Sequence, residues 1–158
     1  MVEIPAAVRG QLEAKNFWQF VTINADGSPT ATPVWADVEG AMVLVNTAIG
    51  RRKERNARRD PHVALAMVDR ENPYAWIEIR GTVVEFVEGD PADRSIDALS
   101  QKYLGIERYA SRKPGERRVL LRIEPTRIQL NNEAGSDPER LRAKLAADSV
   151  EVAAAQSE

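Results

Sequence analysis

The chain has 158 residues, of which 43% are hydrophobic and 29% charged, and its formal net charge is −2. This length suits one domain with a substantial core, and the sequence has no apolar run long enough for a transmembrane helix. The absence of cysteine excludes disulfides and thiol catalysis, and a single histidine, His62, argues against a metal site built on imidazoles. Because the N-terminus lacks the basic and apolar regions of a secretory signal, we expect a cytoplasmic protein.

The first part of the chain predicts a short helix followed by hairpins. Ile4, Val8 and Leu12 recur every four residues, which indicates a helix over residues 5–15 with one buried face. The next expected elements are strands over residues 17–24, 30–38 and 41–46, joined by tight turns. Pro33 lies inside the second of these strands. Since proline cannot donate to a central ladder, this stretch is expected at an edge or a bulge.

The remaining elements continue the same pattern. They are a helix over residues 51–60, strands over 63–68, 75–87 and 119–130, a helix ending at Gly105, and a short helix after Pro138. The helix that ends at Gly105 is expected to begin with Asp90 as N-cap and Pro91 at its first position. The last strand is expected to be interrupted at Pro125. Six strands without β-α-β alternation predict an antiparallel sheet that closes on itself, with helices outside.

Positive charge is concentrated in residues 51–59, which carry six basic residues against one acidic residue. Asn46 and Thr47, at the end of a strand, precede this helix. Helix N-termini attract anions through free N–H groups and the helix dipole, and arginine and lysine add direct phosphate recognition. The segment therefore predicts an anion site, although a solvated basic face would have the same sequence.

Two further segments have side chains suited to a ligand. The stretch Thr32 to Trp35 offers backbone groups and a flat apolar wall to a ring system, or else its tryptophan packs in the barrel or at a subunit interface. Trp76, Glu78 and Arg80 alternate on one face of a strand. That face would be exposed to solvent, part of a subunit interface, or one wall of a cleft.

Single residues outside these segments carry less information. His62 is expected at the surface or as a capping residue. Tyr103 and Tyr109 flank a polar, basic loop, from which either could approach a ligand, and Tyr103 is expected to pack against its own helix. The sequence contains no nucleophile elbow, Walker loop or GxGxxG motif, so any redox chemistry would come from a bound cofactor.

In this order, the Thr-Pro-Val-Trp strand, the basic segment and the later Tyr-Ala-Trp-Ile-Glu-Ile-Arg-Gly strand resemble the pyridoxamine-phosphate-oxidase-like split β-barrel superfamily. Within it, the chain is most similar to the branch that uses coenzyme F420, a deazaflavin. The resemblance spans residues 5–130. It implies a mainly β, six-stranded antiparallel split barrel that forms a homodimer, with cofactor sites at the subunit interface. We assign residues 1–132 to this domain and residues 133–158 to a polar tail.

The resemblance also implies the residues that bind the cofactor. They are Thr32, Pro33, Val34 and Trp35 at the ring system, Asn46, Thr47, Arg51, Arg52, Lys53, Arg55 and Asn56 at the phosphate, and Trp76 and Arg80 from the other subunit. Related enzymes that use flavin mononucleotide (FMN) place a basic residue in the ring-lining strand, and this chain has none there. That difference favours the deazaflavin over FMN.

The expected function is hydride transfer from reduced F420 to a conjugated small molecule. The alternatives are an FMN-dependent oxidoreductase on the same barrel and a non-catalytic F420-binding or carrier protein. No catalytic side chain and no metal are assigned. The expected partners are a second copy of the chain and the small-molecule substrate. Nucleic acid is disfavoured because the basic patch is short and the net charge is negative, and no membrane partner is expected.

Overall fold

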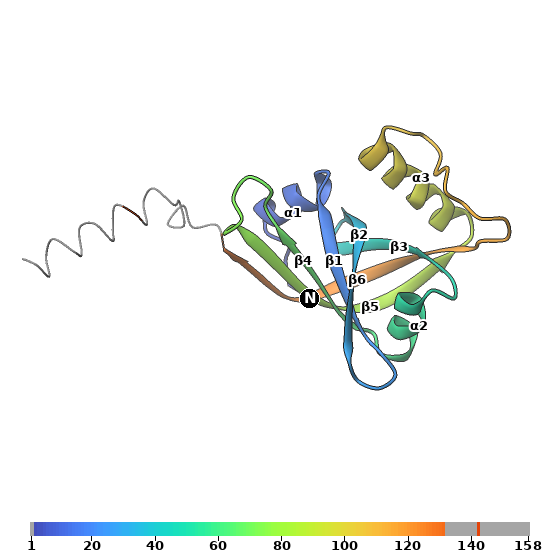
Figure 1. Cartoon of the computed structure of the whole chain (residues 1–158), viewed down its shortest axis with the longest axis horizontal. Coiled ribbons are helices and arrows are strands. Elements are labelled where there is room, and N and C mark those ends of the chain that lie inside the picture. The colour runs from blue at the N-terminus through green and yellow to red at the C-terminus, as the bar shows by residue number, and fades with distance from the viewer. Residues whose placement is uncertain (1, 132–141, 143–158) are drawn as a thin grey trace, which may run out of the picture. The chain divides into compact units, whose positions relative to one another are not determined.

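The structure, a computed structural model, describes residues 2–131 and residue 142. Over these residues, six strands close into a barrel in the order β1-β2-β3-β6-β5-β4 (Figure 1). The elements are α1 (Ala6–Glu13), β1 (Phe17–Ile23), β2 (Pro29–Glu39), β3 (Met42–Ala48), α2 (Arg52–Arg59), β4 (His62–Val68), β5 (Trp76–Glu88), α3 (Asp90–Leu104) and β6 (Arg118–Asn131). The six-stranded antiparallel barrel predicted from the sequence is therefore confirmed.

The chain divides into two compact units. The first comprises Met1–Met67 and Ile77–Leu130, and the second comprises Val68–Trp76 and Asn131–Glu158. The described loop of the second unit is held by Asp69, whose Oδ1 accepts the backbone N–H groups of residues 71 and 72 at 2.8 and 2.9 Å. The predicted tail over residues 133–158, with its helix, lies outside the described residues apart from residue 142. In the part of the chain that the structure describes, no helix is long and apolar enough to cross a membrane.

The barrel interior is filled by large apolar side chains. Along β1, Trp18 and Phe20 are fully buried, whereas Phe17, which precedes them, is exposed. Successive side chains of a strand point to opposite faces, so only alternate residues enter the interior. The largest buried side chains from the other strands are Leu65, Ile79, Leu121 and Ile123. Val8 and Leu12 of α1 belong to the same cluster, so the predicted buried face of the first helix is confirmed. Each such side chain contributes roughly 1.5–3 kcal/mol through burial.

The start of α3 corrects one expectation. The helix is capped by Gly89, at φ 72° and ψ −149°, and no side chain caps it. Asp90 was expected to be the N-cap and is instead the first helical residue. Residues with a side chain rarely adopt this backbone conformation, so glycine occupies the cap position. The helix ends as predicted, with Gly105 in the left-handed conformation at φ 71°.

The expected interruption at Pro125 was wrong. Strand β6 runs unbroken from Arg118 to Asn131. Its pairing with β3 ends at Ile123, so the N–H that proline lacks is not needed for that ladder. The carbonyl of Pro125 still accepts the backbone N–H of Val2 at 3.2 Å.

Strand β2 changes its pairing along its length, and this change leaves an opening between β2 and β3. From Pro29 to Trp35 it pairs with β1, and from Ala36 to Glu39 it pairs with β3. Within the described residues, β2 and β3 therefore separate beyond Ala36. Pro33 lies in the part of β2 that is paired on one side only, which confirms the predicted edge position.

Candidate functional site

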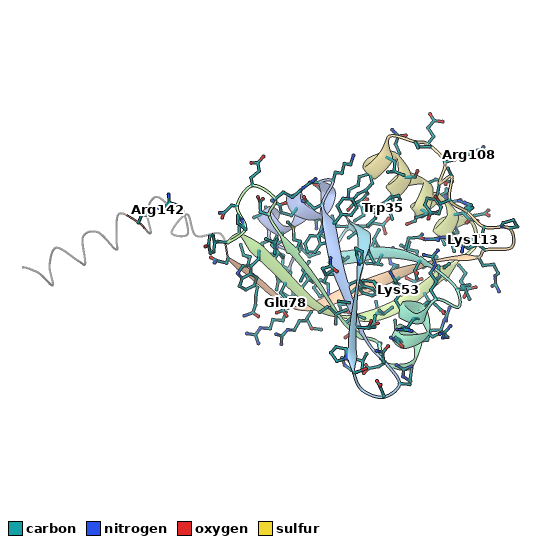
Figure 2. All side chains as sticks on the ribbon, in the orientation of Figure 1. Trp35, Lys53, Glu78, Arg108, Lys113 and Arg142 are labelled. Carbon is teal, nitrogen blue, oxygen red and sulfur yellow. The ribbon has the colours of Figure 1, made fainter. Side chains whose placement is uncertain are left out.

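A cavity of about 250 Å³ lies where β2 and β3 separate. It is lined by Phe17, Pro33, Val34, Trp35, Asn46, Thr47, Arg51, Lys53, Ile96, Tyr109 and Arg118. One side of this pocket is aromatic and another is cationic, and the lining contains no carboxylate. Figure 2 labels Trp35 on β2 and Lys53 on α2, the two residues that mark these sides.

The aromatic side is built on Trp35. Its indole stacks on the ring of Tyr103 in α3, with centroids 5.1 Å apart and planes 10° apart. The ring of Tyr109 meets the same indole edge-on, at 6.0 Å and 85°. The Tyr103 hydroxyl accepts the backbone N–H of Ala36 at 3.2 Å, which ties the helix to β2. Burial raises the pKa of Tyr103, so this hydroxyl stays neutral at physiological pH.

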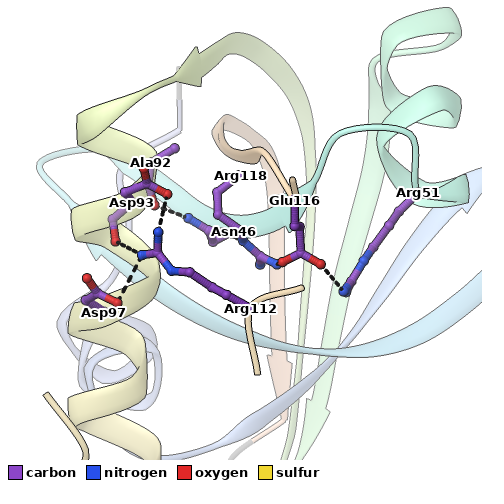
Figure 3. A network of polar contacts seen from close by, with 8 residues as sticks. All are labelled: Asn46, Arg51, Ala92, Asp93, Asp97, Arg112, Glu116 and Arg118. Carbon is purple, nitrogen blue, oxygen red and sulfur yellow. Dashed lines mark hydrogen bonds and ion pairs between the residues drawn. The ribbon is translucent and has the colours of Figure 1, made fainter. Parts of the chain in front are cut away.

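The cationic side contains a buried ion pair. The Arg118 side chain is 3% exposed, and it donates to Glu116 Oε1 at 2.8 Å and to Asn46 Oδ1 at 2.9 Å (Figure 3). Arg51 reaches the other oxygen of Glu116 at 3.3 Å. Burial alone would raise the pKa of Glu116, but the two guanidinium groups outweigh it and the net pKa is lowered. Asn46 also donates to the carbonyl of Ala92, which links β3 to the start of α3.

Lys53 is the cation of this pocket that the protein leaves unpaired. Among the described residues, its half-buried ammonium has no hydrogen-bond or ion-pair partner, whereas Arg51 and Arg118 share Glu116. Burial lowers the pKa of Lys53, and the nearby charges of Arg51 and Arg118 lower it further. An anion in the pocket would offset both effects.

Thr47 supplies a second unsatisfied group. Thr47 is 1% exposed, and its hydroxyl has no hydrogen-bond partner in the part of the chain that the structure describes. Buried polar groups are ordinarily paired. Trp18 Nε1, Thr32 Oγ1 and Ser100 Oγ are unpaired as well among the described residues, and of these four groups the Thr47 hydroxyl is the one whose residue lines the pocket. Lys53, Thr47 and Trp35 line the same pocket, and this combination of a cation, a hydroxyl and an indole suits a ligand that carries both a negative charge and a flat ring.

The chain folds locally so that α2 presents Lys53 to the pocket. Gly50, at φ 86°, makes the turn after β3, and its N–H donates to Glu54 Oε2 at 2.9 Å. Arg58 binds the other oxygen of this carboxylate. Burial would raise the pKa of Glu54, but the hydrogen bonds from Arg58 and Gly50 lower it overall. A buried glutamate in the first turn thus compensates the basic residues that would otherwise oppose the helix dipole.

The pocket contains about half of the residues implied by the sequence. Those that line it are Pro33, Val34, Trp35, Asn46, Thr47, Arg51 and Lys53, and those that do not are Thr32, Arg52, Arg55, Asn56, Trp76 and Arg80. Arg55 folds back onto the carbonyl of Gly50. Asn56 is buried and donates to Thr22 Oγ1 and Asn24 Oδ1 at 3.1 and 3.0 Å, so in this structure it joins α2 to β1.

Other predicted residues lie elsewhere on the barrel. The alternation along β5 is confirmed, with Trp76 and Arg80 exposed and Ile77 and Ile79 buried. Arg80 pairs with Glu78 at 3.1 Å and lines a different, mostly apolar cavity. Binding of a cofactor by Trp76 or Arg80 from a second subunit stays a prediction.

Two expectations about single residues are confirmed. His62 is exposed, and its Nδ1 lies 2.7 Å from Asp60 Oδ1. Tyr103 is buried in the packing of α3. Within the described residues, no group of histidine and acidic side chains could hold a metal ion.

Sequence reasoning missed Arg118, Ile96 and Phe17 as pocket residues, whereas Tyr109, which was expected to approach a ligand from its loop, does line the pocket. Arg118 joins Asn46 across 72 positions of sequence, so no local pattern signals that contact. Phe17 carried one usable signal, because it is a large aromatic residue at an exposed position of a strand.

The fold is that of a split β-barrel protein, and its pocket combines cationic and aromatic side chains. The sequence pattern of the pyridoxamine 5′-phosphate oxidase family matches residues 4–132. The chain belongs to this family, and the resemblance inferred from its motifs is confirmed. No curated protein is significantly similar to the chain in sequence.

Solved structures share the same fold. An F420 reductase is 26% identical, with a TM-score of 0.69, and the match covers 80% of this chain and 98% of that one. A conserved hypothetical protein of Mycobacterium tuberculosis is 22% identical, with a TM-score of 0.66 and coverages of 82% and 85%. A candidate pyridoxamine 5′-phosphate oxidase of Listeria innocua is 20% identical, with a TM-score of 0.61 and coverages of 80% and 97%.

Proposed function

We propose that this chain is a homodimeric, F420-dependent oxidoreductase that transfers hydride to a conjugated small molecule. Membership of the oxidase family and the likeness to an F420 reductase support this proposal. The observation that carries it is Lys53, which has no partner in the described part of the chain and lines the same cavity as the stacked Trp35. Such a pocket suits a coenzyme that has an anionic tail and a flat ring system.

The residues of the pocket fit the two parts of this coenzyme. Lys53, Arg51 and the free hydroxyl of Thr47 would hold the phosphodiester through charge-assisted and neutral hydrogen bonds. Trp35 would flank the ring system, and Tyr109, which stands edge-on to Trp35, would bound the space left for the acceptor. When bound, reduced F420 supplies the hydride that the acceptor receives.

The protein's own part in this reaction is to orient the reactants and exclude water. Trp35 is held rigidly by its stack on Tyr103, so it gives a fixed apolar surface rather than a mobile one. Ile96 and Phe17 add apolar surface around it. The neutral Tyr103 hydroxyl is already bonded to Ala36, and we assign it no role in proton transfer.

The first experiment is a fluorescence titration of the purified protein with F420, in parallel with FMN. We expect F420 to bind with a micromolar or lower dissociation constant. Absence of F420 binding at micromolar concentration would overturn the proposal. Stoichiometric FMN binding in its place would favour the FMN-dependent alternative, and tight F420 binding without oxidation of the reduced coenzyme by quinones would favour a carrier.

Lys53→Ala tests the phosphate assignment. Loss of a charge-assisted hydrogen bond is worth about 1.5–3 kcal/mol, so we expect F420 affinity to fall roughly 10- to 150-fold with the circular dichroism spectrum unchanged. Arg52→Ala is the matched control, since Arg52 belongs to the same helical turn and does not line the pocket. If both variants lost the same F420 affinity, the net charge of the helix, and not a contact in the pocket, would account for the effect.

A further inference from the structure

The loop over residues 105–117 brings Tyr109 to the pocket, and Tyr109 and Arg112 both bind α3. The backbone N–H of Tyr109 donates to Asp97 Oδ1 at 2.9 Å. The guanidinium of Arg112 donates to Asp93 Oδ1 at 2.8 Å and to Asp97 Oδ1 at 3.1 Å (Figure 3). A single carboxylate oxygen of Asp97 therefore holds both the residue that carries the ring and the arginine three positions later.

The placement of the two aspartates makes this docking favourable. Asp93 and Asp97 lie four residues apart in α3, so they share one helix face, and like charges at that spacing repel each other. Arg112 lies between the two carboxylates and offsets this repulsion. With the loop detached, the repulsion would return and the Tyr109 N–H would lose its acceptor.

Tyr109 forms a boundary of the pocket. Its ring stands edge-on to Trp35, at 6.0 Å and 85°, and the Arg118 guanidinium lies over it, 5.3 Å from the ring centroid. Both Trp35 and Arg118 are held by other contacts, to Tyr103 and Glu116 respectively. The width of the pocket beside Trp35 therefore depends on where the loop docks.

We propose that Asp97 is a positioning residue: with Arg112 it forms a latch that fixes Tyr109 as one wall of the pocket and so limits the size of the acceptor. The docking of Tyr109 is supported by the hydrogen bonds of Tyr109 and Arg112 to α3. The selection of acceptors rests in addition on the proposed F420-dependent function. Asp97 contacts the loop and does not line the pocket, so it acts through Tyr109.

Amide exchange of Tyr109 tests the latch without any cofactor. The chain has only three tyrosines, so labelling with ¹⁵N-tyrosine gives three resolvable amide signals. We expect Asp97→Ala to speed exchange of the Tyr109 amide about tenfold or more, and to leave the Tyr103 amide unchanged. Asp97→Asn keeps an acceptor oxygen but loses the charge that binds Arg112, so its effect should be smaller.

Asp90→Ala is the matched control. It removes the same charge from the same helix, and among the described residues Asp90 has no bond to the loop. Its Tyr109 amide should exchange as in the unaltered protein. Equal Tyr109 exchange in Asp97→Ala and the unaltered protein would overturn the latch.

Steady-state kinetics with reduced F420 tests the selection of acceptors. With menadione as a small acceptor, we expect Asp97→Ala to raise KM about tenfold and to change kcat less than twofold. With a bulkier anthraquinone, KM should change less or fall, so the difference in kcat/KM between the two quinones becomes smaller. A fall in kcat that is equal for both quinones, with KM unchanged, would overturn the proposed role in selectivity.

The two experiments separate this inference from the proposed function. If the unaltered protein neither binds F420 nor oxidises its reduced form, the proposed function fails and the selection of acceptors fails with it. The amide-exchange result still decides whether Asp97 and Arg112 dock Tyr109. If F420 turns over normally and Tyr109 exchange does not respond to Asp97→Ala, only the latch is wrong.

Discussion

The barrel interior and the pocket where β2 and β3 separate differ in the groups that they remove from water. The interior buries apolar side chains, whereas the pocket partly buries polar ones. Inside the barrel, Trp18, Phe20 and Leu121 are fully buried among other apolar side chains. In the pocket, the half-buried Lys53 ammonium and the buried Thr47 hydroxyl have no protein partner among the residues that the structure describes. Burial therefore stabilises the fold in one region, and in the other it leaves groups whose cost is offset only when a ligand binds.

Arg118 shows that lining the pocket and serving the ligand are different roles. Its charge is already matched by Glu116, and its Nε by Asn46. By contrast, the Lys53 ammonium pairs with neither Glu116 nor Asn46 in the part of the chain that the structure describes. The comparison predicts that Arg118 behaves as part of the folded framework and that Lys53 behaves as a binding group.

The largest effect is expected for Arg118→Met. It leaves the carboxylate of Glu116 and the Asn46 oxygen without their buried partner, so the free energy of unfolding should fall by about 3–5 kcal/mol. Urea denaturation followed by circular dichroism measures it. Arg51→Met is the control, because Arg51 pairs with the same carboxylate but is 46% exposed, and its change should stay within about 1 kcal/mol. Equal losses would show that burial does not distinguish the two arginines.

Leu121→Ala removes a fully buried side chain from the barrel interior. The cavity left behind should lower the free energy of unfolding by about 2–5 kcal/mol, with F420 affinity of the folded protein nearly unchanged. Leu104→Ala truncates an exposed leucine and should change stability by less than about 0.5 kcal/mol. A large loss of affinity in Leu121→Ala would contradict the separation of core and pocket.

Lys53→Met is expected to have the opposite sign. It keeps the apolar stem and removes a cation that burial, Arg51 and Arg118 all disfavour, so the ligand-free protein should become more stable by about 0.5–2 kcal/mol. Thermal and urea unfolding without ligand test this, and Arg52→Met on the exposed side of the same turn should show no gain. A destabilised Lys53→Met would mean that the lysine has a structural role.

The smallest effect concerns pH and Glu116. Its pKa in the folded protein is lowered from the ordinary value of 4.5, so the stability it contributes is fully present above that value and is lost as the pH falls through the folded pKa. The free energy of unfolding should therefore decrease on acidification below about 4.5. In Glu116→Gln the decrease should be shallower, as measured by urea unfolding at a series of pH values from 6 down to 3. If the free energy of unfolding fell equally steeply with pH in Glu116→Gln and in the unaltered protein, the lowered pKa of Glu116 would not be the cause.

Sequence patterns predicted most of the local structure. The four-residue spacing of Ile4, Val8 and Leu12 gave the buried face of α1, because helical periodicity reports directly which side chains turn inward. The edge position of Pro33 followed from its missing N–H. The pattern was wrong at Asp90 and Pro125, where the backbone conformation of Gly89 and the extent of the β3–β6 ladder decided the outcome.

The candidate site was predicted only in part. The basic segment pointed to Lys53, but the sequence did not distinguish it from Arg55, which folds back onto Gly50, or from Asn56, which is buried against β1. These residues follow one another on a helix, and which of them faces a cavity depends on the strands against which the helix packs.

By itself, the amino-acid sequence determined the kinds and order of the elements, since helix and strand periodicities and turn residues act over a few positions. It also determined that positive charge gathers after the third strand. Only the tertiary structure decided that β2 and β3 separate beyond Ala36, that Arg118 reaches Asn46 from 72 positions away, and that Tyr109 docks on Asp97. Barrel closure brings these segments together, and contacts between residues so far apart in sequence leave no local periodicity to read.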